Sequence, residues 1–432
     1  MPELNAFLAH LKRVFPEAMH PNLWLVGGTV RDLFSGMAPK DIDLVCNLPS
    51  ERLKEIMFRE VRGKSTSPVM FKATPGYLKT EITVLDEGVR IDEELNRRDF
   101  RCNAVAIGLE NIISDPLDGV SDILSGTLTP CSDRSLVNDP LRIFRAFRFV
   151  AHGWRISEEL STLIRLQSWD DALGQIPVER FSREMQKAMK GDYPARFFEL
   201  MAEYSVGKCY LPEIFMMQQI PAGPACYHGD DTVFSHSLDV LRRMSEKSHD
   251  PTARLAAFFH DLGKLETPEE MLPRHIGHDK AGEVAAKELF RRLRLPTSIG
   301  KAVGAACLLH LKAGLWHEMR NSRKLALAEK AVKSGIEKWL PDLVYADRNQ
   351  DEAMPGWAQF TEAAAKSSSE LGVPKERLAA APPSDRRRII NEARLELLKN
   401  RGLCSRQAPL KQPTARHIGT TGKGTRQDRT NG

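Results

Sequence analysis

The chain has 432 residues, of which 42% are hydrophobic and 28% are charged, as expected for a globular protein with more than one domain. We find no run of 18 apolar residues, so the sequence predicts no membrane-spanning helix. The formal net charge of +5 equals the excess of residues 406–432, which hold six basic side chains and one acidic one. A nucleic-acid surface would therefore have to come from local clustering of charge, and not from the bulk of the chain.

The N-terminal residues and the cysteines predict a cytoplasmic protein. The first residues, MPELNAFLAHLKRVF, are amphipathic and charged, which is not typical of a secretory signal or an anchor. Seven cysteines are scattered singly without a CxxC pair, which indicates free thiols and a cytoplasmic location. The segment 406–432 is rich in Gly, Thr, Gln and Arg, and we expect it to be a disordered basic tail.

Taken in chain order, the hydrophobic pattern predicts a small α/β region followed by a long all-α region. Residues 1–20 read as a helix, and WLVGG reads as a buried strand that enters a turn. TVRDLFSG predicts a short helix, and DIDLVC and KTEITVL predict two further strands. From about residue 137 helical periodicity takes over, in LRIFRAFRFVAHGW, PVERFSREMQKAMKG, SHSLDVLRRM and GEVAAKELFRRLRL.

Two aspartates follow a double glycine at a spacing that suits metal and phosphate chemistry. Asp41 and Asp43 are one residue apart in a strand-like segment, so both would project from one face, about 6–7 Å apart. Such a pair can bind the same divalent cations. Gly27 and Gly28 lead into a helix, where backbone N–H groups can approach a triphosphate without a Cβ in the way.

This stretch, LVGGTVRDLFSGMAPKDIDLV, resembles the GG-x-V-RD…D-x-D signature of the DNA polymerase β nucleotidyltransferase superfamily. More narrowly, it resembles the class II tRNA nucleotidyltransferase and bacterial poly(A) polymerase family. The resemblance implies that Asp41 and Asp43 are catalytic and hold Mg²⁺, and that Gly27, Gly28 and Arg31 bind the nucleotide.

A block after the third predicted strand extends the resemblance. NRRDFRCNAVA resembles the family's RRDFTINA, whose arginines and Asp-Asn pair contact the triphosphate and sugar. Two adjacent guanidinium groups also suit a phosphate site on chemical grounds. The resemblance gives these roles to Arg97, Arg98, Asp99 and Asn103. Glu81 lies where such enzymes often have an acidic residue, and it is either a third metal ligand or a glutamate on the strand surface.

A further block, NDPLRIFRAFRF, resembles EDP-x-R-x-x-RA-x-RF, in which an Asp and an Arg form an amino-acid template that reads the incoming base. The corresponding residues are Asp139 and Arg142, and Arg145 and Arg148 join them as nucleotide-binding candidates. A carboxylate accepts from the exocyclic amines of cytosine and adenine and a guanidinium donates to ring acceptors, so C and A fit. An asparagine precedes this pair where the family usually has glutamate.

The second half carries histidines around a His-Asp dipeptide, and FFHDLGK resembles the HD phosphohydrolase superfamily. Imidazole and carboxylate donors together suit a transition metal such as Ni²⁺, Co²⁺ or Mn²⁺. The ligands implied by the order H…HD…D are His236, His260, Asp261 and Asp347. Candidates for the phosphate side of that site are His275, His278 and His310.

Together these blocks imply a polymerase-β-like nucleotidyltransferase head, a helical neck and body, and a helical HD domain. The boundaries we predict are 1–136 for the catalytic domain, 137–222 for the nucleotide-selecting and tRNA-binding helices, 223–350 for the HD domain, 351–405 for a C-terminal helical region and 406–432 for the tail.

The resemblance implies an enzyme that adds C and A to the 3′ end of tRNA from CTP and ATP, with an HD half that hydrolyses phosphate esters such as 2′,3′-cyclic or 2′-phosphates. Only thirteen residues separate EIT (81–83) from RRDF (97–100), whereas full CCA-adding relatives carry a longer flexible loop there. Addition of CC alone therefore stays open. Poly(A) synthesis also stays open, although the basic stretch that such enzymes carry after DxD is missing. The non-enzymatic alternative is an inert tRNA-binding protein of the same fold.

Overall fold

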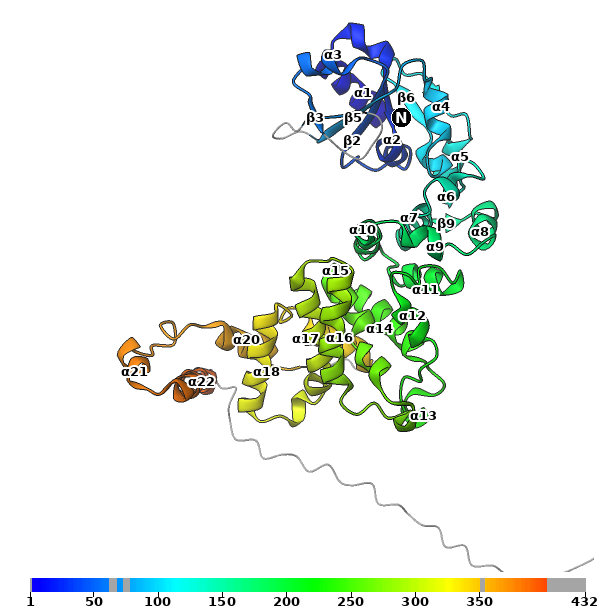
Figure 1. The fold of residues 1–432 in the computed structure, drawn as a ribbon. Helices are drawn as coiled ribbons and strands as arrows, with labels where there is room; N and C mark the ends of the chain where they lie inside the picture. The colour runs from blue at the N-terminus through cyan, green and yellow to red at the C-terminus, as the bar shows by residue number, and fades with distance from the viewer. Residues whose placement is uncertain (1, 62–67, 73–77, 350–353, 402–432) are drawn as a thin grey trace, which may run out of the picture.

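The computed structural model describes residues 2–61, 68–72, 78–349 and 354–401, and the predicted basic tail lies outside this described part. The elements follow one another along an arc, with a mixed α/β head at one end and helices alone from the middle onward (Figure 1). The expected order of an α/β head followed by helical regions is therefore confirmed. No helix of the described residues is both long enough and apolar enough to cross a bilayer.

The head is built on a seven-stranded sheet with the order β3-β4-β5-β2-β1-β6-β7. Strands β2 and β5 run parallel, and the other neighbouring pairs of this sheet are antiparallel. The strands are β1 (Leu23–Val26), β2 (Ile42–Cys46), β3 (Arg59–Val61), β4 (Val69–Lys72), β5 (Thr80–Val84), β6 (Ala106–Gly108) and β7 (Ile113–Ser114). The helices and 3-10 turns of the head are α1 (Pro2–Val14), η1 (Glu17–Asn22), α2 (Gly27–Phe34), α3 (Ser50–Glu55), α4 (Ile91–Asn96), η2 (Arg101–Asn103) and α5 (Gly119–Ser125).

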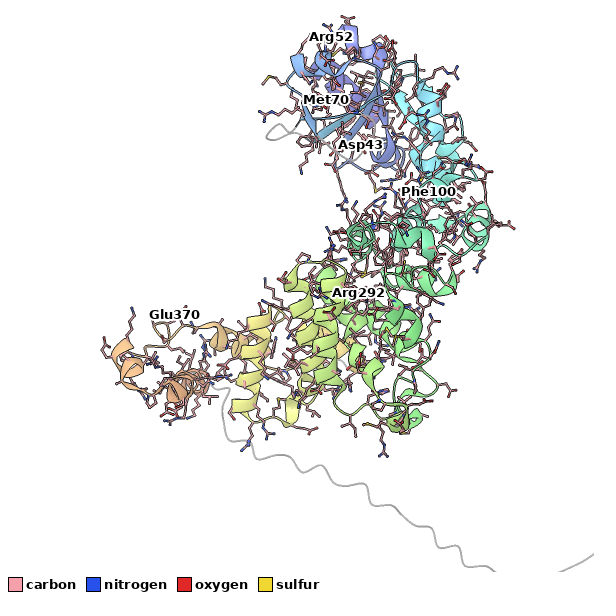
Figure 2. The ribbon with its side chains drawn as sticks, viewed as in Figure 1. Asp43, Arg52, Met70, Phe100, Arg292 and Glu370 are labelled. Carbon is pink, nitrogen blue, oxygen red and sulfur yellow. The ribbon has the colours of Figure 1, made fainter. Side chains whose placement is uncertain are left out.

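Side chains of β2 alternate between the two faces of the sheet, which determines where its acidic residue points. Ile42 and Leu44 pack into the main hydrophobic core, whereas Val45 packs into a smaller cluster on the other face. Asp43 shares that second face and lies at the edge of the head nearest the helical part of the chain (Figure 2). The alternation therefore keeps its carboxylate out of the main core.

Two differences from the predicted elements have simple causes. The first helix ends at Val14 and not at residue 20, because Pro16 cannot donate a helical hydrogen bond and disfavours a helical residue before it. Asp41 lies in the bend just before β2, whose first residue is Ile42, so the two aspartates do not share a regular strand.

A helical neck and body follow the head. These elements are β8 (Thr127–Leu128), α6 (Ser135–Asn138), α7 (Arg142–Ala151), β9 (Arg155–Ile156), α8 (Glu158–Arg165), α9 (Asp170–Gly174), α10 (Val178–Ala188), α11 (Ala195–Glu203), α12 (Pro212–Met217) and α13 (Ala225–His228). Helix α7 packs against α10 and α11 through aromatic rings: the Phe144 ring lies 4.7 Å from Phe181 and 6.2 Å from Phe197. The arginines of α7 lie outside this aromatic core, and Arg142 and Arg145 contact the head.

The remaining helices form the HD region and a C-terminal extension. These elements are α14 (Val233–Lys247), α15 (Pro251–Phe259), η3 (Leu262–Glu266), η4 (Glu269–Met271), α16 (His278–Arg292), α17 (Thr297–Gly314), η5 (Trp316–Glu318), α18 (Asn321–Ser334), α19 (Leu340–Arg348), α20 (Trp357–Ala365), α21 (Lys375–Ala380) and α22 (Pro383–Asn400). Helices α14, α15, α17 and α19 pack against one another, and α16 covers α17 and η3.

Candidate active sites

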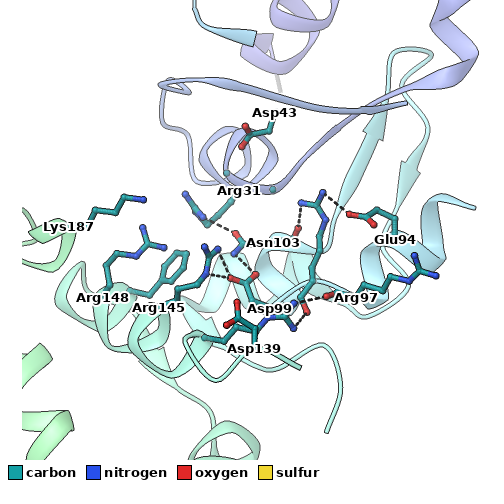
Figure 3. A pocket seen from close by; sticks show the side chains of 15 residues that line it. Arg31, Asp43, Glu94, Arg97, Asp99, Asn103, Asp139, Arg145, Arg148 and Lys187 are labelled. Carbon is teal, nitrogen blue, oxygen red and sulfur yellow. Dashed lines mark hydrogen bonds and ion pairs between the residues drawn. The ribbon is translucent and has the colours of Figure 1, made fainter. Parts of the chain in front are cut away.

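A pocket of about 510 Å³ lies where the head meets α7, and it gathers residues from five separate stretches of the chain (Figure 3). It contains all eleven predicted nucleotide-binding residues and Asp43. Seven of the lining side chains are cationic and four are acidic, so the pocket suits a polyanion. Its lining consists of Gly27, Gly28, Arg31, Asp43, Glu94, Arg97, Arg98, Asp99, Asn103, Asp139, Arg142, Arg145, Arg148, Phe149 and Lys187.

Asp43 is the acidic residue of β2 that lines this pocket, whereas Asp41 and Glu81 act on it from outside the pocket lining. Asp43 pairs in register with Glu81 across the parallel β2–β5 ladder, so both side chains lie on one face. Burial raises the pKa of Asp43 above its ordinary value, and the negative charges of Glu81 and Asp41 raise it further, against the opposing effect of Arg98. An oxygen-only cluster with this much negative charge fits a hard divalent cation.

The turn after β1 brings backbone close to this cluster. Gly27 has φ +63°, and a Cβ there would lie 3.0 Å from Arg98 Nη1 and 3.7 Å from Asp43 Oδ2. A side chain at this position would therefore be strained and would fill the space between a carboxylate and a guanidinium group. The absence of a side chain keeps this end of the pocket open.

A chain of hydrogen bonds connects the head to α7 across the floor of the pocket. Arg31 Nη1 donates to Asn103 Oδ1 at 2.8 Å, and Asn103 Nδ2 donates to Asp99 Oδ1 at 3.0 Å. Arg145 Nε donates to Asp99 Oδ2 at 2.8 Å. Burial alone would raise the pKa of Asp99, but the Arg145 charge and the hydrogen bond from Asn103 hold that pKa well below its usual range. Asp99 is therefore an anion that fixes Arg145 directly and Arg31 through the Asn103 amide.

The predicted base-reading pair lies at the start of α7. Arg142 donates to the backbone carbonyls of Arg97 at 2.8 Å and Arg98 at 3.0 Å, so it rests against the arginine block of the head. Asp139 Oδ2 accepts from Arg180 Nη2 of α10 at 2.8 Å. Motif reasoning assigned no role to Arg180, although it lies in the helix quoted as PVERFSREMQKAM.

Two further residues missed by sequence reasoning lie on the α7 and α10 side of the pocket. The Phe149 ring lies under Arg31, with 5.1 Å from Cζ to the ring centroid, and under Arg148 at 4.6 Å. Arg148 Nε also pairs with Glu184 at 2.7 Å, and Lys187 extends from the same helix into the pocket. The family block ends at Phe149, so its aromatic ring could have been noticed; nothing in the sequence points to Lys187.

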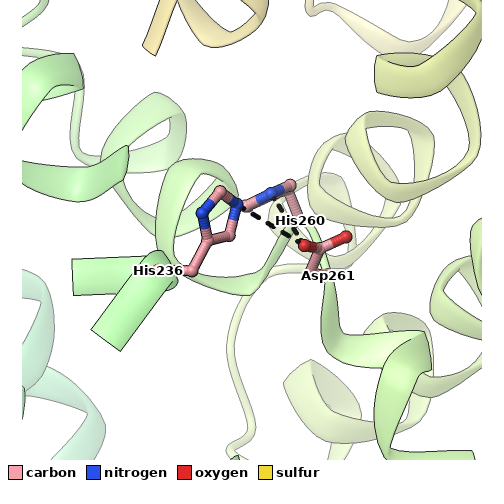
Figure 4. Close-up of side chains that lie close together, drawn as sticks. All are labelled: His236, His260 and Asp261. Atoms are coloured by element: carbon pink, nitrogen blue, oxygen red, sulfur yellow. Dashed lines mark ion pairs between the residues drawn. The ribbon is translucent and has the colours of Figure 1, made fainter. Parts of the chain in front are cut away.

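The second candidate site lies between α14, α15, η3 and α19, where the structure brings the four predicted HD ligands together. His236 Nε2 lies 3.1 Å from Asp347 Oδ1 and 3.6 Å from Asp261 Oδ2. His260 Nε2 lies 3.3 Å from Asp347 Oδ1 and 3.2 Å from Asp261 Oδ2 (Figure 4 shows His236, His260 and Asp261). These atoms converge as metal ligands do.

The hydrogen bonding of His260 leaves one of its ring nitrogens available to a cation. His260 Nδ1 lies 2.9 Å from the Ala257 carbonyl and therefore carries a hydrogen, which directs Nε2 towards the two carboxylates. Buried His260 Nε2 has no hydrogen-bond partner among the described residues. Burial opposes protonation of this ring, but Asp261 and Asp347 raise the pKa of His260 to about 10. The donor set of imidazoles and carboxylates fits a transition metal.

The three histidines predicted for the phosphate side, His275, His278 and His310, differ in what their ring nitrogens face. His278 Nε2 and His310 Nε2 lie 3.3 Å and 3.5 Å from Asp261 Oδ1. His275 has both ring nitrogens occupied, by Thr267 Oγ1 at 2.9 Å and by the Pro221 carbonyl at 2.8 Å, although it still lines the cavity.

Sequence reasoning missed Lys264, which lies in the quoted HDLGK motif. Its Nζ donates to Asp261 Oδ2 and to the Ala222 carbonyl, each at 2.6 Å. Among the described residues, the cavity beside this cluster has a volume of about 210 Å³ and is lined by Ala222, Gly223, Pro224, His236, Asp261, Lys264, Pro273, His275, His278, His310, Leu311 and Asp347.

Three models of known protein families match this chain. Residues 23–83 match the Poly A polymerase head domain, residues 153–217 match the probable RNA and SrmB-binding site of polymerase A, and residues 233–338 match the HD domain. A nucleotidyltransferase head and an HD domain both imply the use of divalent metal ions.

Curated relatives and solved structures agree with these models. The multifunctional CCA protein of Teredinibacter turnerae is 32% identical over 67% of this chain and 74% of the relative, and that of Legionella pneumophila is 31% identical over 71% and 78%. The fold is similar to that of the Bacillus stearothermophilus CCA-adding enzyme in complex with CTP, with 20% identity, a TM-score of 0.61 and 93% of each chain covered. It is also similar to the Thermotoga maritima CCA-adding enzyme complexed with tRNA, with 19% identity, a TM-score of 0.59, and 93% and 96% covered. The chain therefore belongs to the bacterial CCA-adding enzyme family whose members carry an HD domain.

Proposed function

We propose that this protein adds C and A residues to the 3′ end of tRNA from CTP and ATP, without a nucleic-acid template. The observation that carries the proposal is the junction pocket, where Asp43 of the head faces the arginines of α7. The relatives named as multifunctional CCA proteins support it, as does the fold shared with CCA-adding enzymes bound to CTP or tRNA.

In this reaction the 3′ oxygen of the RNA forms a bond to the α-phosphorus, the bond to the bridging oxygen breaks, and pyrophosphate leaves. We assign the reacting end of the pocket to Asp43, Asp41 and Glu81, with Mg²⁺ as the cation because every donor is an oxygen. Mg²⁺ held there would neutralise triphosphate charge and lower the pKa of the attacking hydroxyl. Asp41 and Glu81 are exposed, which leaves this end open to an RNA terminus.

We assign the triphosphate to the cationic part of the pocket. Arg97, Arg98, Arg31 and Lys187 all line this part, and Arg98 is held by the Asn103 carbonyl and by Glu94. Guanidinium groups can bind phosphate oxygens in pairs, which fixes the position of the nucleotide as well as its charge. The open backbone at Gly27 lets the phosphates approach the carboxylates closely.

Base selection follows from the groups at the start of α7. Asp139 Oδ2 accepts from Arg180, and its other oxygen, Oδ1, accepts only a long 3.3 Å bond from the Leu141 N–H. A fixed carboxylate that cannot donate would accept the exocyclic amine of cytosine or adenine and would repel the carbonyl oxygen of uracil or guanine at that position. Arg142, held by the carbonyls of Arg97 and Arg98, would supply the donors for the ring acceptors.

One observation favours a second candidate, the addition of CC alone. Strand β5 ends at Val84 and α4 begins at Ile91, so only the six residues Leu85–Arg90 connect them. We noted above that full CCA-adding relatives are expected to have a longer loop here. Incorporation of AMP therefore distinguishes the two candidate activities.

For the HD cluster we propose hydrolysis of phosphate esters at RNA ends, with 2′,3′-cyclic and 2′-phosphates as substrates. His236, His260, Asp261 and Asp347 would hold a transition metal such as Ni²⁺, Co²⁺ or Mn²⁺, and that metal would supply an activated water. Lys264, beside Asp261 at the edge of the cavity, provides a positive charge next to the place where a phosphate would sit.

Product length on tRNA that lacks its 3′ CCA tests the transferase. CTP alone should add two residues, and CTP with ATP should add a third. A product that stops after CC in the presence of ATP would identify the CC-only enzyme, and long products from ATP alone would identify poly(A) synthesis.

A substitution at the reacting end separates an enzyme from an inert tRNA-binding protein. Asp43→Asn should lower incorporation by at least about 10³-fold, because one carboxylate of the metal cluster is lost. Asp133→Asn, an exposed change outside the pocket lining, is the matched control and should leave the rate unchanged. Equal rates for Asp43→Asn and the parent would contradict the proposed site.

A further inference from the structure

We propose that a second pocket beside the HD cavity binds the nucleoside of the phosphate ester whose phosphate lies at the HD cluster. The inference rests on the phosphohydrolase function proposed above, and it identifies where the rest of the substrate is held. This side pocket has a volume of about 380 Å³ and is lined by Gln219, Pro221, Gly223, Ala225, Gly229, Asp230, Asp231, Thr232 and Pro273.

The side pocket and the HD cavity share part of their lining. Gly223 and Pro273 line both, so the side pocket begins where the HD cavity ends. Small-molecule sites in proteins measure about 300–1,000 Å³. The HD cavity, at about 210 Å³, is smaller than this, whereas the side pocket, at about 380 Å³, falls within the range. The HD cavity therefore suits a phosphate group, and the remainder of a nucleotide needs the space beside it.

Side chains of the HD cavity hold the wall between the two spaces. Lys264 Nζ donates to the Ala222 carbonyl at 2.6 Å, and His275 Nε2 donates to the Pro221 carbonyl at 2.8 Å. On the other side, the Ala222 N–H donates to the backbone carbonyl of Asp231 at 2.7 Å. The wall is therefore fixed from both sides, and His275 contributes to the HD site by positioning it.

The charges that line the two spaces determine the direction in which a nucleotide binds. Lys264 supplies a positive charge in the HD cavity, where the bound metal would add to it. The side pocket has the carboxylates of Asp230 and Asp231, and no lysine or arginine among the described residues lines it. A phosphate is thus attracted to the HD cavity and repelled from the side pocket. The uncharged nucleoside is the part of the substrate that the side pocket can accept.

The polar groups of the side pocket match those of a nucleoside. The carboxylates of Asp230 and Asp231 accept hydrogen bonds, which ribose hydroxyls and exocyclic amines of bases can donate. The amide of Gln219 can both donate and accept. Pro221 and Pro273 add apolar ring surface against which a base can lie. A few polar groups on an apolar lining are typical of sites that bind small organic molecules.

Two phosphate monoesters of secondary alcohols test the inference on the full-length chain. Adenosine 2′-monophosphate carries a nucleoside, whereas glycerol 2-phosphate does not, and their leaving groups are alike. Phosphate release is measured after the chain has been loaded with Ni²⁺, Co²⁺ or Mn²⁺ in turn. We expect kcat/KM to be at least about 10-fold higher for the nucleotide, the effect of a single hydrogen bond to a charged group. The difference should lie mainly in KM.

Substitutions in the side pocket should bring this ratio towards one. Asp230→Ala removes a carboxylate, and Ala225→Trp fills the space; each should raise KM for the nucleotide by about 10-fold. Gln219→Ala should raise it by about 5-fold. Gln218→Ala is the matched control, because Gln218 is exposed and does not line the pocket, and it should keep the parent ratio.

The outcomes distinguish this inference from the function on which it rests. A parent ratio near one would overturn the inference and leave the phosphohydrolase function intact, whereas hydrolysis of neither ester would overturn both. Parent ratios in both Asp230→Ala and Ala225→Trp would place the nucleoside elsewhere and overturn the inference. Should Ala225→Trp fail to fold by circular dichroism, Asp230→Ala at an exposed position decides the outcome.

Discussion

At the residue scale, the acids of the junction pocket are held in place by bases from elsewhere in the chain. Asp139 is fixed by Arg180 of α10, and Asp99 by Arg145 of α7. Neither carboxylate can rotate freely, because each accepts hydrogen bonds on both of its oxygens. A fixed acceptor can discriminate between bases, since the wrong base cannot be accommodated by turning the side chain.

Asp139→Asn should change which nucleotide is used. The amide can donate where the carboxylate only accepts, so UTP becomes acceptable relative to CTP. A single base contact is worth about 1–3 kcal/mol, which corresponds to a shift of about 5- to 150-fold in the ratio of kcat/KM for CTP and UTP. Asp133→Asn, an exposed neighbour, should leave the ratio unchanged. An unaltered ratio for Asp139→Asn would exclude this residue from base reading.

Asp99 predicts a particular dependence of stability on pH. Its pKa in the folded chain is depressed below the ordinary value of 3.8, so folding favours its charged form. The stability it contributes is fully present above about pH 5 and is lost as the pH falls through 3.8 towards the folded value. Asp99→Asn should lower stability by about 2 kcal/mol at pH 7 and by less near pH 3. Calorimetry of the parent and Asp99→Asn from pH 3 to pH 7 measures this difference in stability, with Asp133→Asn as the control. A difference that does not change with pH would contradict the assigned role of Asp99.

The residues that sequence reasoning missed share one property. Arg180, Lys187 and Lys264 reach their sites through packing of helices, and although Arg180 and Lys264 lie in quoted motifs, the motifs alone assigned them no contact. The residues found from motifs were those whose chemistry is concentrated in short blocks, such as the arginines of RRDF. Their placement in one pocket, however, depended on the register of β2 with β5 and on where α7 packs.

At the element scale, the HD dipeptide is positioned by a backbone contact. The turn η3 packs against the first turns of α16 at Gly263, where a Cβ would overlap the carbonyl oxygen of His278 and the backbone of Gly282. This close approach brings Asp261 and His278 to the same cavity. The glycine therefore determines the distance between the two sides of the HD cluster.

Gly263→Ala should reduce the phosphohydrolase activity of the HD region and leave nucleotide addition by the head unchanged. The added methyl group must push η3 away from α16, and a displacement of about 1 Å at a catalytic site can cost about 10²-fold in rate. We expect phosphohydrolase activity to fall by that order while CMP incorporation is unchanged. Gly174→Ala, where a Cβ would meet no atom within 4 Å, is the control and should preserve both. Full hydrolase activity in Gly263→Ala would show that this contact is dispensable.

Elements were predicted well where periodicity was long and poorly where it was short. The strands β1, β2 and β5 follow clear apolar patterns, whereas β3, β6 and β7 have only two or three residues each. All three residues of β3 are exposed, so it offers no alternation to detect. Pairing with β4 at the edge of the sheet, and not local pattern, makes it a strand.

At the scale of the whole molecule, one buried arginine joins the body to the HD region. Arg254 of α15 is only 1% exposed, and it donates to the carbonyls of Met189 at 2.8 Å and Gly191 at 2.7 Å, which follow α10. It also bonds the Ser248 carbonyl at 2.8 Å. The rings of Phe198 and Phe258 stack 3.9 Å apart beside it, between α11 and α15. These contacts make the junction a continuous part of the core.

Arg254→Met should destabilise this junction by about 3 kcal/mol, because several buried carbonyls lose their donors at once. The midpoint of thermal unfolding should fall, and the HD region should unfold separately from the head. Arg242→Met is the comparison, since Arg242 also bridges α14 to α11 but its side chain is 51% exposed, and its loss should cost under about 1 kcal/mol. Equal effects of the two substitutions would contradict this account.

The two clusters differ in donor atoms: the head offers oxygen alone, whereas the HD region offers imidazole nitrogen as well. Oxygen donors suit hard Mg²⁺, whereas imidazole donors suit nickel, cobalt or manganese, so the two sites depend on different metal supplies. In a bacterium starved of these trace elements, our assignments predict continued tRNA maturation alongside a failure to clear damaged RNA ends. The metal supply of the cell, and not the amount of protein, would then determine whether the chain only extends tRNA or also hydrolyses damaged RNA ends.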